Sequence, residues 1–160
     1  MAALLGRMPA GDFSVVVRSA AGAPVVILNA PLLQDGTPMP TRYWLVDPDL
    51  RRRVSRLESG GGVSAAMREV DPELLDEAHR RYALERDREI DPVHRGPRPS
   101  GGVGGTRQGV KCLHAHLAWY LAGGEDPVGS WVAARIDVER GSYVIDRVGG
   151  RRQEGFSGTG

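Results

Sequence analysis

The sequence has one cysteine, one lysine and no long apolar run. Because Cys112 is the only cysteine, no disulfide can form within the 160-residue chain, and nothing points to an oxidising compartment. No stretch approaches the roughly 20 apolar residues that a membrane helix needs. The apolar start before Arg7 is also too short for a signal peptide. We therefore expect a soluble, cytoplasmic protein that does not contact a membrane.

Neither sign of charge dominates. The 21 basic residues nearly balance the 20 acidic ones, so the formal net charge is +1. Twenty of the basic residues are arginine, and the single lysine, Lys111, stands beside Cys112. This balance excludes a strongly basic nucleic-acid-coating protein and an acidic, solvating chain. Arginines 51–53 have acidic residues on both sides, which is typical of a solvated helix face, and we expect no nucleic-acid partner.

The order of local patterns predicts an α+β fold. Short β-branched or apolar runs at 13–18, 25–28 and 43–46 are typical of strands separated by turns. Asp47, Asp71 and Asp126 each precede a proline, a pair that favours a helix start because the carboxylate caps free N–H groups and proline lacks one. Further helices are expected at 63–69 and 110–122. The whole is a small N-terminal antiparallel sheet packed against four to five helices.

One globular domain is expected over residues 12–140. A proline- and glycine-rich loop interrupts it at 90–109. Residues 1–11 form a short N-terminal extension. The glycine-rich segment 141–160 is expected to be a disordered tail, although 143–145 has the composition of a short strand.

The glycine-rich part of this loop is a candidate anion site. Five of the ten residues before Val110 are glycines, among them Gly104 and Gly105, and the expected helix that follows offers free N–H groups. Arg107 and Lys111 add positive charge, so we expect an anionic or phosphorylated small molecule as ligand. Neither a P-loop nor a dinucleotide fingerprint is present, because Val110 and Arg107 occupy the positions that lysine and glycine would need. A solvent-exposed loop whose glycines merely permit turns fits the same residues.

The residues after the loop are candidates for chemistry at a thiol. Cys112 near a helix N-terminus beside Lys111 is expected to have a lowered pKa and to act as a nucleophile, with His114 or His116 as base. Helical spacing places Cys112 and His116 on one face and turns His114 away. The same face could bind a divalent metal such as zinc through Cys112 and His116, with His79 as a further ligand. A small buried cysteine beside a hydrogen-bonded helix histidine is the alternative.

Several short segments resemble one known family. They are PMPTRYWL at 38–45, SRLE at 55–58, AHRRYA at 78–83, ERD at 85–87 and GVKCLHAH at 109–116. Together they resemble the bacterial family catalogued as domain of unknown function 501 over about residues 13–136, and the Lys-Cys-Leu-His core is the most specific part.

The resemblance implies an intracellular protein whose gene lies near those for a septum-formation protein and an exopolyphosphatase-like enzyme. It implies no agreed activity and supplies no catalytic residue. Two interpretations therefore stay open. One is a protein with a thiol or metal site beside an anion-binding loop, and the other is a non-catalytic adaptor or regulatory protein associated with cell division or phosphate metabolism.

Overall fold

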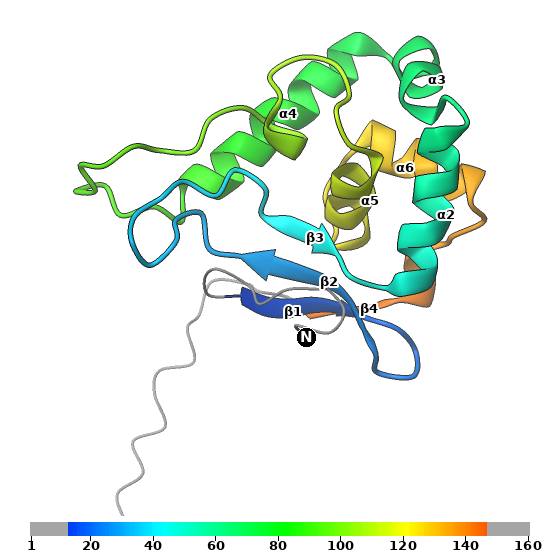
Figure 1. Cartoon of the computed structure of the whole chain (residues 1–160), viewed down its shortest axis with the longest axis horizontal. Helices are drawn as coiled ribbons and strands as arrows, with labels where there is room; N and C mark the ends of the chain where they lie inside the picture. The colour runs from blue at the N-terminus through cyan, green and yellow to red at the C-terminus, as the bar shows by residue number, and fades with distance from the viewer. Residues whose placement is uncertain (1–12, 147–160) are drawn as a thin grey trace, which may run out of the picture.

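The computed structural model describes residues 13–146 as a sheet with helices on one side of it (Figure 1). In chain order the elements are β1 (Phe13–Arg18), β2 (Pro24–Asn29), β3 (Tyr43–Leu45), α2 (Pro48–Ser59), α3 (Gly62–Glu69), α4 (Pro72–Asp87), η1 (Val103–Gly105), α5 (Leu113–Leu121), α6 (Pro127–Arg135), η2 (Arg140–Ser142) and β4 (Val144–Ile145). The α+β class is confirmed, with five α-helices in the part described.

The sheet is antiparallel and has the order β3-β2-β1-β4. A bulge after Val15 shifts the β1–β2 register, so that Val17 pairs with Val26. The fourth strand comes from the other end of the chain, where β4 pairs with β1 through Val17 and Ile145. The sheet is thus mostly N-terminal, and β4 lies within the segment 141–160 assigned to the tail. Residues 147–160 of that tail and the extension 1–11 lie outside the described residues.

The three predicted aspartate–proline helix starts are present. Asp47 accepts a hydrogen bond from the N–H of Leu50, and Asp71 accepts one from that of Glu73. Asp126 accepts two, from the N–H groups of the second and third helical residues. Each cap satisfies donors that the first turn of a helix leaves unpaired. The helix expected at 110–122 begins only at Leu113. Cys112 is its N-cap and has an extended backbone.

The most buried helix is α5, which the sheet and the other helices surround (Figure 1). Its close neighbour α6 depends on Gly129, where a Cβ atom would lie 2.4 Å from that of Tyr120 and 2.5 Å from the carbonyl oxygen of His116. Glycine therefore allows the two helices to approach closely. The core that α5 shares with the sheet and α2 includes Val17, Val26, Leu45, Val54, Leu113, Leu117 and Leu121.

Between residues 13 and 146, the structure contains no helix that is both long and apolar enough to cross a bilayer.

Candidate functional site

Cys112 is the N-cap residue of α5, and its backbone is extended, with φ −144° and ψ 114°. The side-chain spacing of a helix therefore does not apply to it. Its Sγ lies 3.9 Å from Nδ1 of His114. The expectation that Cys112 shares a face with His116 and that His114 points elsewhere is therefore wrong. Cys112 precedes the helix, and its side chain lies beside His114.

Glu58, near the end of α2, completes a three-residue cluster. Its Oε1 lies 2.8 Å from Nδ1 of His114, and its Oε2 accepts the backbone N–H of Leu113 at 3.2 Å. One side-chain atom each from Glu58, Cys112 and His114 lies within 4.8 Å of the other two. Sequence reasoning missed Glu58, and no local signal marks it, because only the packing of α2 against α5 brings it to the thiol.

The other ring nitrogen of His114 fixes the orientation of the imidazole. Nε2 lies 3.2 Å from the carbonyl oxygen of Arg51 and 3.2 Å from Oγ of Ser55, both on α2. A carbonyl oxygen only accepts, so Nε2 carries a hydrogen and donates it. Nδ1 is thereby directed at Cys112 and Glu58, and it can hold or release a proton there.

The thiol and the imidazole shift each other's pKa. Burial acts to raise the pKa of Cys112, but the hydrogen bond to His114, the N–H of Ala115 and the positive charge of His114 outweigh it and lower that pKa. Burial likewise acts to lower the pKa of His114, but its contacts with Cys112 and Glu58 outweigh burial and raise it. Both shifts favour a thiolate facing an imidazolium.

A pocket of ≈ 580 Å³ opens beside this cluster. Residues before and within β3 form a largely apolar wall, α2 supplies polar side chains, and the start of α5 supplies the thiol. The lining residues are Met39, Pro40, Thr41, Tyr43, Trp44, Leu45, Arg51, Ser55, Cys112, His114 and Ala115. We call this the thiol pocket. Its volume is in the range of small-molecule sites, about 300–1,000 Å³.

His116 and His79 lie together, but neither belongs to the cluster. His116 is fully buried, and its Nδ1 lies 2.6 Å from Oδ2 of Asp126. The His79 ring centroid is 5.8 Å from that of His116. Nδ1 of His79 accepts the N–H of Val103 at 3.0 Å, and its Nε2 donates to the carbonyl oxygen of Gly109 at 2.8 Å. In this structure His79 therefore holds the glycine-rich loop, and His116 holds the start of α6.

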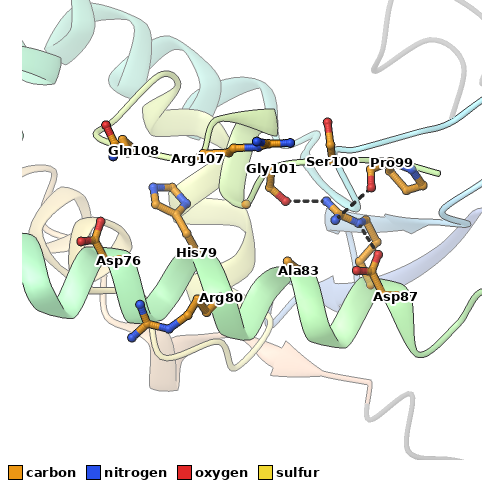
Figure 2. A pocket seen from close by; sticks show the side chains of 12 residues that line it. Asp76, His79, Arg80, Ala83, Asp87, Pro99, Ser100, Gly101, Arg107 and Gln108 are labelled. Atoms are coloured by element: carbon orange, nitrogen blue, oxygen red, sulfur yellow. Dashed lines mark hydrogen bonds and ion pairs between the residues drawn. The ribbon is translucent and has the colours of Figure 1, made fainter. Parts of the chain in front are cut away.

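The glycine-rich loop lies against the thiol on one side. Gly104 and Gly105 have positive φ angles of 69° and 79°, which glycine tolerates best. A Cβ atom at Gly104 would lie 3.7 Å from the Cβ of Cys112. Arg107 instead lines a separate pocket of ≈ 430 Å³ between the loop and α4 (Figure 2). Lys111 is exposed and lines neither pocket.

The pocket beside Arg107 is built around a buried arginine. Arg86, 1% exposed, donates to the carbonyl oxygens of Gly101 and Pro99 and forms an ion pair with Asp87 (Figure 2). Its guanidinium therefore ties the loop to α4.

The roles expected from the sequence stay predictions. They are catalysis by Cys112, His114 and His116, and ligand binding by Gly104, Gly105, Arg107 and Lys111. The third is metal binding by Cys112, His116 and His79.

No curated protein and no solved structure matches this chain. Residues 15–134 match the model of a family described as "Protein of unknown function (DUF501)". The match covers more than half of the chain, and it includes β2, β3, α2 to α5, α6 except its last residue, and the Glu58–Cys112–His114 cluster. The chain therefore belongs to the DUF501 family, as the segments around Lys111 and Cys112 indicated.

Proposed function

We propose that Cys112 is a nucleophilic thiol, with His114 as its acid–base partner, in a reaction that transfers or hydrolyses an acyl group. The observation that carries the proposal is that Cys112 and His114 both line the thiol pocket and that their Sγ and Nδ1 atoms form a cluster with the Glu58 carboxylate. A thiolate is intrinsically nucleophilic, and a neighbouring histidine is the partner that commonly activates it. The N-terminal end of α5 adds a positive potential that favours the thiolate.

Each residue has a defined role in this reaction. The Cys112 proton moves to Nδ1 of His114, and Sγ forms a bond to the carbonyl carbon of the substrate. The bond from that carbon to the leaving group breaks, and the leaving group takes the proton from Nδ1. In hydrolysis, water then gives a proton to Nδ1 and its oxygen replaces Sγ. The charge of Glu58 stabilises the imidazolium, and the Arg51 carbonyl keeps the ring in place.

The chemistry of this thiol favours a reducing compartment. A partly accessible cysteine with a lowered pKa is prone to oxidation, because oxidation follows thiolate character and exposure. We therefore place the protein in the cytoplasm, where thiols are kept reduced. A non-catalytic adaptor would have no need for a reactive thiol, so the reactivity of Cys112 also tests that alternative.

The pH dependence of alkylation tests the thiol directly. Since Cys112 is the only cysteine, iodoacetamide reports on this position alone. We expect the alkylation rate to rise with pH and to show an inflection below the pKa of a free thiol, about 8.5. An inflection at the free-thiol value, or no labelling of the folded protein, would overturn the proposal. Labelling of the unfolded chain to completion serves as the control for total thiol.

Two variants connect that reactivity to the cluster. His114→Gln should move the inflection upward, because the positive charge beside Sγ is lost. His94→Gln is the matched control, since His94 is in the proline-rich loop, where its Nε2 lies 3.2 Å from the carbonyl oxygen of Pro97, and it is not part of the cluster. Equal inflections in the two variants would contradict the role of His114.

A second candidate is a metal centre, and the chemistry of the three side chains favours it. Thiolate, imidazole and carboxylate are all zinc ligands, and three protein ligands with one open position are typical of catalytic zinc. Nε2 of His114 donates to a backbone carbonyl, as the second nitrogen of a metal-binding histidine commonly does. In tetrahedral zinc sites the ligand atoms lie roughly 3.3–3.6 Å apart. Here Nδ1 of His114 lies 2.8 Å from Oε1 of Glu58 and 3.9 Å from Sγ of Cys112, so small side-chain movements would bring the three atoms to those distances.

The metal content of the purified protein separates the two candidates. Elemental analysis of protein never exposed to chelators should find zinc, iron or manganese at one equivalent if the cluster is a metal centre. Glu58→Gln should then lower that content, while Glu125→Gln, an exposed glutamate paired with Arg81, should not. Protein with well below one equivalent of metal removes this candidate and leaves the thiol alone.

A further inference from the structure

A second hollow adjoins the thiol pocket on the solvent side of α2. It has a volume of ≈ 480 Å³ and is lined by Pro48, Arg51, Arg52, Ser55 and Arg56. These positions form one stripe of the helix, because residues three and four apart lie side by side. Arg51 and Ser55 line the thiol pocket as well, so the two hollows share part of their lining. We call the second one the arginine hollow.

Besides His114, the charged side chains that line the two hollows are arginines. Three arginines line the arginine hollow, and none of the described residues lining either hollow is acidic. Arg52 has an exposed partner in Asp49 at 3.6 Å, an ion pair of the kind that contributes little. Guanidinium groups match phosphate oxygens in pairs, so a stripe of arginines is suited to a phosphate-bearing ligand.

The thiol pocket has apolar lining that the arginine hollow lacks. Met39, Pro40, Trp44 and Leu45 line the thiol pocket but not the arginine hollow. A ligand that fills both hollows therefore places an uncharged part beside Sγ and an anionic part over α2. The two volumes together suit a molecule of cofactor size rather than a folded partner.

From this arrangement we infer that the substrate is an acyl donor whose leaving group carries phosphate, with the acyl group in the thiol pocket and the phosphate on Arg52 and Arg56. The inference rests on the proposed function of Cys112. In the step, Sγ forms a bond to the carbonyl carbon, the bond from that carbon to the leaving group breaks, and the leaving group takes the proton from His114. Water later releases the acid, so no other reactant is needed.

A pair of thioesters tests the leaving group. Octanoyl-coenzyme A and octanoyl-N-acetylcysteamine carry the same acyl group and the same reacting bond, but only the first has phosphates. The acylation of Cys112 is followed by intact mass and by release of the free thiol. At low salt we expect the phosphate-bearing donor to react roughly tenfold faster, and the advantage to shrink at about 0.5 M salt because screening weakens exposed charge pairs.

Charge-neutral variants of α2 locate the effect. Arg52→Gln with Arg56→Gln should remove most of the rate advantage that the coenzyme A ester has over the neutral ester. Arg68→Gln with Arg88→Gln changes the net charge equally at exposed positions outside both hollows and should leave both rates unchanged.

The outcomes separate this inference from the proposed function. Equal rates for the two donors, with a Cys112 whose alkylation still shows an inflection below that of a free thiol, overturn the phosphate-bearing substrate and keep the thiol. A loss of the advantage in the Arg68/Arg88 variant as well would show a general charge effect and would also overturn it. A Cys112 that neither ester acylates and iodoacetamide does not label overturns both.

Discussion

Oε1 of Glu58 lies 2.8 Å from Nδ1 of His114. A carboxylate near the end of α2 therefore contacts the nitrogen that we propose as the acid–base atom, in the first turn of α5. The other oxygen of the same carboxylate accepts the N–H of Leu113. Glu58 thus satisfies a free donor of the first turn of α5 and holds the imidazole at the same time. It joins the stability of the helix contact to the charge of the site.

Glu58→Gln should lower the pKa of His114, because the negative charge that helps to raise it is lost. An NMR titration of the His114 ring protons measures this, and Glu125→Gln is the control at an exposed glutamate. Since the folded-state pKa of His114 is raised, its stabilising contribution is present below the ordinary value of 6.5 and is lost as pH rises through the folded pKa.

The same variant should therefore lose more stability in acid than in base. Urea unfolding should show a loss of about 1 kcal/mol at about pH 6 and a smaller loss at about pH 9. A loss that is equal at the two pH values would mean that Glu58 acts through its bond to Leu113 and not through the charge of His114.

Asp126→Ala should destabilise the protein by about 2–4 kcal/mol, because it removes a helix cap and leaves a buried histidine nitrogen without its hydrogen-bond partner. The carboxylate caps α6 with Oδ1 and binds His116 with Oδ2, and both side chains are fully buried. Asp126→Asn keeps the cap but turns an amide toward Nδ1, so the proton of His116 must move to Nε2, which has no partner within the described residues. We expect an intermediate cost of about 2 kcal/mol.

Asp71→Ala is the matched control, since Asp71 is an exposed cap that accepts a single bond and holds no histidine. It should cost about 1 kcal/mol in chemical denaturation. If the Asp126 and Asp71 alanine variants lose the same free energy of unfolding, the His116 contact contributes nothing beyond the cap.

Gly102→Ala should cost about 2–3 kcal/mol by thermal unfolding, because the added methyl group has no space. A Cβ atom at Gly102 would lie 2.5 Å from both the Cβ and Nδ1 of His79, which would push apart the contact that holds the loop to α4. Gly141→Ala is the control, since nothing lies within 4 Å of a Cβ atom there. It should change stability by less than about 0.5 kcal/mol, and an equally small change at Gly102 would show that the loop can move away from His79.

Much of the fold could be predicted because its signals are local. The carboxylates of Asp47, Asp71 and Asp126 act on N–H groups two or three residues away, so the sequence shows these helix starts directly. The strand pairing was less accessible. Nothing near Val144 indicates that it joins β1, because a pairing between the two ends of a chain leaves no local pattern.

The sequence by itself determined that this is an α+β domain of the DUF501 family with a lone cysteine at the start of a helix. Only the tertiary structure decided which groups face that cysteine. The extended backbone of Cys112 turns Sγ to His114 rather than His116, and the packing of α2 on α5 brings Glu58 to the same nitrogen. A reactive site depends on distances between side chains far apart in the chain, and those distances exist only once the helices have packed.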